Sequence, residues 1–413
     1  MDPGTGGEKP MILAGLLLLS GWGWAALAEK GKPTLWQAVV GAVASCGGWF
    51  LLLALIGVRW KPWLAVLPLL VGLTLTISRA GALGLALRSR PGHAVAAVLA
   101  LAVFSQLPAW GWDFRYQWGL KAKVFAAFGG IDGVWLANPE VAFANPHYPP
   151  LWPTLLAFAM HLGNGAEQAA GIWTALLRVG LASAGWSLAF RGQLWQRWLA
   201  GALGLLAPVL FRPFFSGYAE PLLALLLAST VAAITSERGT STSALWVLFS
   251  LLGLAKGEGL LWLACLGAAG WRQWGKPQRL AFFLSFLPAL VWLSWALRNV
   301  PGTGVIELTW ERLVPRLLEL PSALLKAGLE ASLAVLAFGL AVFASWGRTP
   351  LAKASLWFFL GLALVYVGGP HPLSWWLANS LQRVLAVPVP ALLASGLVRE
   401  KPLAPAPQDE PAA

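Results

Sequence analysis

The stretch SALWVLFSLLGLAKGEGLLWLACLGAAGW, residues 243–271, carries the two features that decide the fold. It is apolar over more than the roughly 20 residues that one helix needs to cross the hydrocarbon core of a bilayer. KGEG interrupts the run and places the charges of Lys256 and Glu258 between two apolar halves. The pattern indicates a membrane protein in which this segment is either one long helix or two half-helices that meet at KGEG.

The composition of the whole chain agrees with that interpretation. Of 413 residues, 58% are hydrophobic and 11% are charged, whereas a soluble domain has about 25% charged residues. Apolar stretches recur along the chain and are separated by short loops that carry Arg, Lys, Pro and Gly. The sequence therefore predicts an all-α polytopic membrane protein with roughly 11–13 transmembrane helices.

Apolar windows define the expected spans. They are Met11–Ala28, Thr34–Val58, Pro62–Leu87, His93–Trp110, Ala166–Phe190, Trp198–Phe211, Ala219–Thr235, Arg279–Leu297, Leu329–Ala344, Ala354–Val367 and Val384–Val398, with one or two more in residues 243–271. The first is expected to be retained, although its AALA ending also resembles a signal-peptide cleavage site. Residues 111–150 are too polar to cross lipid, and Leu151–Leu162 is too short, which favours an interfacial or re-entrant helix.

The net charge of +12 is explained by topology rather than by nucleic-acid binding. Basic residues occur in small groups between the expected spans, as the positive-inside rule requires of cytoplasmic loops. If the spans alternate, these groups share the cytoplasmic side, and residues 111–150 form a long first loop on the extracytoplasmic side. The stretch 299–326 then also lies on the extracytoplasmic side, and the Pro- and Ala-rich residues 399–413 are a disordered cytoplasmic tail.

Neither a metal site nor a disulfide is predicted. The two cysteines, Cys46 and Cys265, lie far apart within apolar runs. The four histidines lack the HxxH or HExxH spacing of zinc sites.

The stretch WDFRYQWGLKAKVF, residues 112–125, raises the first question about function. As an α-helix it would place Asp113, Gln117 and Lys121 on one face, with Trp118 and Phe125 available for the membrane interface. On local pattern alone, an interfacial anchor is favoured, because aromatic residues and lysines are common at that depth. An anchor does not explain the aspartate, because lipid phosphates prefer cations.

Other polar residues lie beside or within the expected spans, and each also has a purely structural explanation. They are His147 and Tyr148 in NPHYPPLWP, Glu220 in SGYAEP, Lys256 and Glu258 in KGEG, His371 in GGPHPL, and Arg383 just before the last span. The alternatives are a Pro-rich turn for the first pair, a favourable helix dipole for Glu220, a loop between half-helices for KGEG, and a helix-end anchor for Arg383.

The predicted topology places all of these residues on the same extracytoplasmic side. Carboxylates and cations at the rim of an apolar cavity suit a substrate that is part lipid and part phosphate. A carboxylate can act as general base on an acceptor hydroxyl, while cations offset the charge on a departing phosphate.

The order of WDFRYQWGLKAK, HYPPLWP, SGYAEP, LAKGEG and the late Arg383 resembles the membrane glycosyltransferases of the GT-C superfamily. The likeness is to bacterial relatives of the dolichyl-phosphate-mannose protein mannosyltransferases, glycosyltransferase family 39. It covers residues 94–398, so residues 1–92 are expected to be additional N-terminal transmembrane helices and residues 93–398 the catalytic domain.

This resemblance implies a GT-C-like bundle in a bacterial inner membrane, with interfacial helices in the first extracytoplasmic loop. It also implies a polyprenyl-phosphate sugar as donor, inversion at the anomeric carbon, and no cofactor. Enzymes of this family are generally regarded as not needing a metal, and metal use stays open for this chain. Asp113 would be the catalytic base, and Glu220 matches a second, less defined acid. Residues expected to bind the donor phosphate or shape the site are Lys121, His147, Tyr148, Lys256 and Arg383, with Glu258 and His371 added from their predicted side.

One departure from the family pattern bears on the acceptor. Protein mannosyltransferases typically carry two adjacent acids in the first loop, whereas here Phe114 follows Asp113. A protein acceptor is therefore less favoured than a glycolipid or a cell-envelope glycan.

Two functions of other classes remain open on the sequence. A transporter or flippase for a lipid-linked or polar solute would use Lys256 and Glu258 as an intramembrane relay. A scaffold subunit would bind lipid without chemistry. Neither function gives a catalytic role to the different polar residues that are predicted to share one side.

Overall fold

The computed structural model describes residues 8–28, 33–89, 91–107, 109–210, 217–236, 240–300, 309–347, 349–369 and 371–397. Over these residues the chain forms helices and no strands. Hydrogen bonds within helices satisfy the backbone without a sheet, which is what a lipid environment requires. The predicted all-α class is therefore confirmed, whereas the predicted tail 399–413 lies outside the described residues.

The helices follow one another along the chain as follows. The N-terminal part contains α1 (Glu8–Ala28), α2 (Leu35–Leu55), α3 (Pro62–Ser78), α4 (Ala80–Ser89) and α5 (Pro91–Phe104). Residues 111–161 contain the π-helix η1 (Phe114–Trp118), α6 (Gly119–Phe128), α7 (Gly133–Ala137), the 3-10 helix η2 (Pro139–Ala144) and α8 (Leu151–His161). The remainder contains α9 (Ala166–Leu188), α10 (Leu194–Leu210), α11 (Glu220–Ile234), α12 (Thr242–Ala255), α13 (Gly257–Gly270), α14 (Lys276–Asn299), α15 (Trp310–Glu330), α16 (Ser332–Ser345), α17 (Pro350–Gly368), α18 (Leu373–Ala386) and α19 (Val389–Gly396).

Several of these helices are long and apolar enough to cross a bilayer. Among the described residues, five segments qualify: Lys9–Ala28, Leu35–Leu55, Lys276–Asn299, Pro350–Gly368 and Leu373–Gly396. The number rises to seven if the bent pairs α3–α4 and α15–α16 each count as one span. The chain is therefore a multi-pass membrane protein, and the larger count of 11–13 spans stays a prediction.

The predicted span Pro62–Leu87 is not one straight helix. The axes of α3 and α4 meet at an angle of 75° on either side of Arg79. The Arg79 guanidinium donates a hydrogen bond to the carbonyl of Ala26 at the end of α1. A charged group within an apolar segment needs a polar partner. The bend between α3 and α4 lies at Arg79, where the Ala26 carbonyl supplies that partner.

The stretch 299–326, which is predicted to lie on the extracytoplasmic side, contains in its described part the long helix α15. The charged residues of this stretch and its prolines Pro315 and Pro321 lie within the helix. The helix turns by 99° into α16. The predicted span Leu329–Ala344 is therefore α16 with the last residues of α15.

The last span begins earlier than predicted. It covers Leu373–Gly396 rather than starting at Val384, so Arg383 lies near its middle instead of at its end. Polar residues of this segment find partners without leaving the helix: the Asn379 side chain donates to the Trp375 carbonyl, and the Ser380 hydroxyl donates to the Trp376 carbonyl. Satisfied polar groups allow an apolar helix to continue through residues that a hydropathy window excludes.

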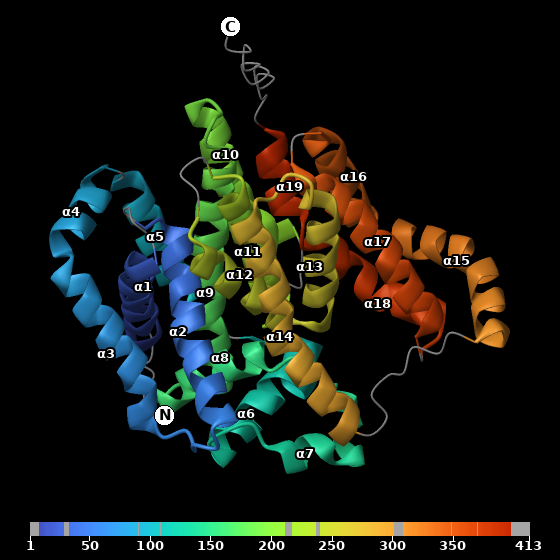
Figure 1. The fold of residues 1–413 in the computed structure, drawn as a ribbon, viewed down its shortest axis with the longest axis horizontal. Helices are drawn as coiled ribbons and strands as arrows, with labels where there is room; N and C mark the ends of the chain where they lie inside the picture. The colour runs from blue at the N-terminus through green and yellow to red at the C-terminus, as the bar shows by residue number, and fades with distance from the viewer. Residues whose placement is uncertain are drawn as a thin grey trace, which may run out of the picture.

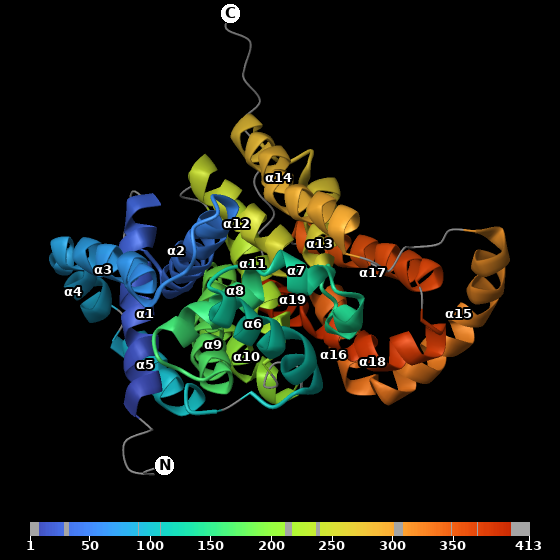
Figure 2. The same cartoon turned by 90° about the horizontal axis from the view of Figure 1, so that it is seen from below.

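The short helices α6, α7 and α8 lie together across one end of the long helices (Figures 1 and 2). Within this layer α8 is enclosed by protein, because every residue from Leu151 to Ala159 is buried. A helix enclosed in this way contacts protein rather than lipid, and its placement as an interfacial or re-entrant helix stays a prediction. Its hydrophobicity instead serves the core of the protein.

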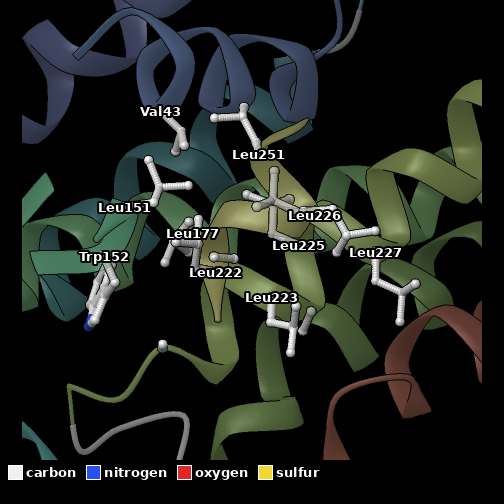
Figure 3. Close-up of a cluster of buried hydrophobic side chains, with 14 of the residues drawn as sticks. Val43, Leu151, Trp152, Leu177, Leu222, Leu223, Leu225, Leu226, Leu227 and Leu251 are labelled. Carbon is white, nitrogen blue, oxygen red and sulfur yellow. The ribbon is translucent and has the colours of Figure 1, made fainter. Parts of the chain in front are cut away.

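That core brings together residues from segments far apart in the sequence. Figure 3 shows Val43 of α2, Leu151 and Trp152 of α8, and Leu177 of α9 gathered around the leucines of α11, with Leu251 of α12 beside them. Where helices are surrounded by lipid, tight side-chain packing rather than expulsion of water holds them together. The core thereby fixes the N-terminus of α11, where Glu220 begins the helix.

Candidate functional site

Five charged side chains from separate segments form one connected ionic network. Its members are Asp113, Glu220, Lys256, Glu258 and Arg383. Hereafter these five residues are called the ionic network. The sequence suggested only that they share one side of the membrane, and the fold brings them into direct contact.

Glu220 lies at the centre of the network. Its Oε1 atom accepts hydrogen bonds from Arg383 Nε at 2.8 Å and from Lys256 Nζ at 3.0 Å. Arg383 Nη2 lies 2.7 Å from the same oxygen and 2.6 Å from Asp113 Oδ2. Lys256 Nζ lies 2.7 Å from Glu258 Oε1. Each cation therefore bridges Glu220 to a second carboxylate.

Helix ends and breaks place these side chains. Glu220 is the first residue of α11 and is followed by Pro221, a residue suited to the first turn of a helix. Lys256 is extended (φ −164°, ψ 165°) between α12 and α13. Residues 243–271 therefore form two helices that meet at KGEG rather than one long helix. Glu258 lies in the first turn of α13, where the helix dipole favours an acid.

A glycine permits this break. A Cβ atom at Gly259 would collide with the backbone carbonyl of Leu252 in the preceding helix. Only glycine allows α12 and α13 to approach this closely at the turn. The second glycine of KGEG is thus a packing requirement that keeps Lys256 and Glu258 at the junction.

The network is buried at its centre and more accessible at its ends. The side chains of Glu220 and Lys256 are 1% and 5% exposed, whereas those of Arg383, Glu258 and Asp113 are 17%, 19% and 20% exposed. Removing one partner of a buried ion pair costs about 3–5 kcal/mol, because it leaves an uncompensated charge. The centre therefore depends on mutual pairing, while the ends can exchange partners with a ligand.

Tyr218 is a site residue that the sequence analysis did not select. The Arg383 guanidinium carbon lies 4.5 Å from the centre of its ring, a distance typical of a cation–π contact. The guanidinium thus packs over the Tyr218 ring while it contacts Glu220. Its position two residues before Glu220 in SGYAEP was the available signal.

A second polar cluster surrounds Lys121, which is 1% exposed. Its Nζ donates to the Asn145 carbonyl at 2.6 Å, and the Asn145 side chain donates to Gln117 Oε1 at 3.1 Å. Asn145 has a left-handed backbone (φ 49°), unlike every other non-glycine residue that the structure describes. Burial lowers the pKa of Lys121 from its ordinary value of 10.5 to about 7. Lys121 can therefore change charge near neutral pH.

Tyr148 connects the Lys121 cluster to the ionic network. Its ring stacks on Trp118 with ring centres 5.7 Å apart, and Lys121 Nζ lies 5.8 Å from the centre of the Tyr148 ring. Burial, followed by the nearby charge of Glu258, raises the pKa of Tyr148 to about 12. Charges of Lys256, Arg383 and Asp113 also act on this hydroxyl. Tyr148 is thus protonated at neutral pH and lies between the two groups.

His147 is also close to both groups. Its ring packs edge-on against Tyr148, and its backbone carbonyl accepts a hydrogen bond from Trp292 Nε1 at 2.9 Å. Burial lowers the pKa of His147 to about 4, with a further contribution from the charge of Lys121. The imidazole is therefore neutral at pH 7.

The prediction for residues 112–125 is only partly correct. Residues 114–118 are π-helical rather than α-helical, and the wider turn changes which side chains share a face. Asp113 contacts Arg383, whereas Gln117 and Lys121 both turn to Asn145. Trp118 and Phe125 are buried in protein and do not reach a membrane interface.

His371 is the predicted site residue that stands apart. It is exposed and packs against the rings of Trp375 and Trp376. Among the contacts of the described residues, none joins it to the ionic network.

No metal centre is formed by the residues that the structure describes, because no three His, Cys, Asp or Glu side chains are grouped to hold an ion. Comparison with models of protein families, with curated proteins and with solved structures found no match. The chemistry of the site is therefore inferred from its own geometry.

Proposed function

We propose that this protein is an integral membrane glycosyltransferase that moves a sugar from a polyprenyl-phosphate carrier to an extracytoplasmic acceptor. One observation carries the proposal: the accessible carboxylate of Asp113 shares the Arg383 guanidinium with the buried Glu220. This arrangement brings a possible base next to a possible phosphate ligand. Sugar transfer from a lipid phosphate needs both, one for each side of the reacting carbon.

Asp113 is proposed as the general base. Its carboxylate takes the proton of the acceptor hydroxyl as the hydroxyl oxygen forms a bond to the anomeric carbon of the donor. The bond from that carbon to the phosphate oxygen breaks, and the phosphate leaves with the electron pair. Attack opposite the leaving group inverts the anomeric carbon.

Arg383 is proposed to exchange Asp113 for the donor phosphate. Its guanidinium has geometry suited to bidentate binding of phosphate oxygens. The contact with Asp113 joins two partly exposed side chains, whereas the contact with Glu220 is buried, so the Asp113 contact is the easier one to exchange. The exchange would also free the Asp113 carboxylate to accept a hydrogen bond from the acceptor hydroxyl.

Glu220 is proposed as a positioning residue rather than a second base. Its Oε1 holds both Arg383 and Lys256, and its side chain is almost fully buried. A carboxylate that holds two cations is a weak proton acceptor.

The Lys121 cluster is proposed to complete the phosphate site. With a pKa of about 7, Lys121 is partly uncharged in the empty enzyme, and a bound phosphate would favour its protonated form. Tyr148 and neutral His147 lie between Lys121 and the ionic network, where they can donate or accept hydrogen bonds.

The proposed side and substrates rest on the sequence. The positions of basic residues favour an extracytoplasmic site, and the resemblance to glycosyltransferase family 39 implies a GT-C-like bundle in a bacterial inner membrane. Phe114, in place of a second acid, favours a glycolipid or envelope glycan over a protein as acceptor.

The test is transfer by purified protein from a panel of polyprenyl-phosphate sugars, with acceptor-dependent release of the lipid phosphate as the readout. Asp113→Asn should remove this release and leave the protein folded. Asp132→Asn is the matched control, because Asp132 caps α7 and lies outside the ionic network, and asparagine is also a good cap. Absence of release with every donor would overturn the proposal.

A second candidate function is favoured by the break between α12 and α13. Paired charges at a broken apolar helix are also the pattern of a transport site. This alternative predicts that cysteines placed at Lys256 and Glu258 react with impermeant reagents from both sides of the membrane. Labelling from one side only would exclude it.

A further inference from the structure

Helix α15 (Trp310–Glu330) presents a long apolar face that no described segment of the protein covers. Exposed fractions are 76% for Trp310, 78% for Leu318, 67% for Leu325 and 70% for Leu329. These positions recur at helical spacing, so they line one side of the helix. The helix lies at the opposite edge of the molecule from α3 and α4 (Figures 1 and 2).

The other sides of α15 differ from this apolar face. Ala323 and Ala327 are buried where the helix packs against the protein. Glu319 and Lys326 are exposed, and each lies next in sequence to an exposed leucine. Glu311, in the first turn, is seven residues before Leu318 and shares the side of that leucine. Because neighbouring residues are about 100° apart around a helix, one exposed side is apolar and the next is charged. Lipid on one side and water on the other would produce this division.

The bend at Ala331 supports an in-plane orientation. Helix α16 is apolar throughout and exposes Leu333, Leu336, Leu340 and Phe343, as expected of a segment that contacts lipid. The axes of α15 and α16 differ by 99°. If α16 runs into the membrane, α15 must lie nearly parallel to the membrane surface.

Two arginines attach α15 to the junction between two candidate spans. Arg312 Nη2 and Arg316 Nη1 each donate to the Gly369 carbonyl at 2.6 Å. Gly369 lies between the end of the candidate span Pro350–Gly368 and the start of the candidate span Leu373–Gly396. Two spans that end and begin at the same place mark a membrane boundary, and the arginines hold α15 at that boundary.

We propose that α15 is an in-plane membrane helix whose apolar face lies in the lipid and whose Glu319 and Lys326 face lies in water. Its partner is the bilayer surface, since the apolar face continues into the lipid-exposed side of α16. This placement is independent of the proposed transferase activity. It goes beyond that activity by fixing the membrane level beside α18, the helix that carries Arg383.

The test compares adjacent residues in the full-length protein reconstituted in lipid nanodiscs. Single spin labels are placed at Leu318→Cys and Glu319→Cys, and at Leu325→Cys and Lys326→Cys. Both native cysteines, which are buried, are replaced by alanine. Collision with oxygen, which concentrates in lipid, is compared with collision with a water-soluble nickel chelate.

We expect the leucine positions to favour oxygen and their charged neighbours to favour the nickel chelate in both pairs. Leu333→Cys on α16 serves as a lipid-exposed reference, and gel filtration of each labelled protein checks that it is folded. Equal preference for the nickel chelate within a pair would place α15 in water, and equal preference for oxygen would place it across the membrane. Low access of both reagents to the leucine positions would indicate a protein partner, such as a second copy. Each of these three results overturns the proposal.

Discussion

The centre and the ends of the ionic network contain the same kinds of residue but differ in what surrounds them. Glu220 and Lys256 are buried and paired through Glu220 Oε1, whereas Asp113 and Glu258 keep about a fifth of their side-chain surface exposed. Breaking a buried ion pair greatly reduces stability, because it leaves an uncompensated charge. Replacing an accessible carboxylate costs little stability, and a substrate can reach it. In the proposed mechanism, burial rather than residue type separates the structural acid Glu220 from the reactive acid Asp113.

The largest effect is expected at the centre. Glu220→Gln leaves Arg383 and Lys256 without their shared carboxylate and should reduce the free energy of unfolding by about 3–5 kcal/mol. Thermal unfolding in detergent measures the change. Glu258→Gln is the matched control and should cost less, because Glu258 is more exposed and Lys256 keeps Glu220 as a partner. Equal losses for the two variants would show that centre and ends do not differ.

Arg383→Lys probes the residue that joins the centre to an end. Lysine keeps the charge but cannot contact Glu220 and Asp113 with the same planar group. We expect a loss of about 1.5–3 kcal/mol in donor binding, which is tenfold or more in the KM for the donor, with a smaller loss of stability. An unchanged KM would remove Arg383 from the phosphate site.

The pH dependence of donor binding tests the Lys121 cluster. As pH rises through about 7, Lys121 loses its proton in the empty enzyme, so the KM for the donor should increase. Neighbouring His147 and Tyr148, with pKa values of about 4 and about 12, do not titrate between pH 6 and 9. Lys121→Arg should give a flat profile over that range, because arginine keeps its charge. Parallel profiles for the two proteins would contradict the assignment.

Stability should respond to pH through the same residue. The folded state binds fewer protons than the unfolded state between the Lys121 pKa of about 7 and its ordinary value of 10.5. The free energy of unfolding should therefore increase as pH rises through this interval. The increase should be absent in Lys121→Met, and a chemical denaturation series of both proteins measures it.

The smallest effect is expected outside the network. His371 is exposed, and its ring packs against those of Trp375 and Trp376. His371→Ala should change the rate of transfer by less than about twofold, as surface substitutions away from a site usually do. A larger loss would place His371 in the site despite its position.

The sequence was informative where one local property decides the structure. Apolar length predicted a helical membrane protein, and the glycines and charges of KGEG indicated a possible break between α12 and α13. The polar, Pro-rich composition of residues 111–150 correctly excluded a single span. Each of these outcomes depends on residues that are neighbours in the chain.

The remainder depends on contacts between distant segments. Hydropathy could not show that Arg383 lies near the middle of a span, because its charge is offset by acids more than 160 residues away. Aromatic content suggested that Trp118 faces the interface, yet Tyr148 and the surrounding core bury it. A window over α15 detects its charges but not their confinement to one face. Sharing one side of a membrane predicted that the acids and cations could meet, but not which atoms pair.

The most direct measurement of the central claim is acceptor-dependent release of polyprenyl phosphate by Asp113→Asn beside Asp132→Asn. Loss of a general base reduces a rate by about 10²–10⁴-fold, so Asp113→Asn should lose activity to that extent at an unfolding temperature close to that of the wild type. Asp132→Asn should retain activity. Equal release by the two folded variants would contradict the role of Asp113 and, with it, the distinction between the reactive ends and the structural centre of the ionic network.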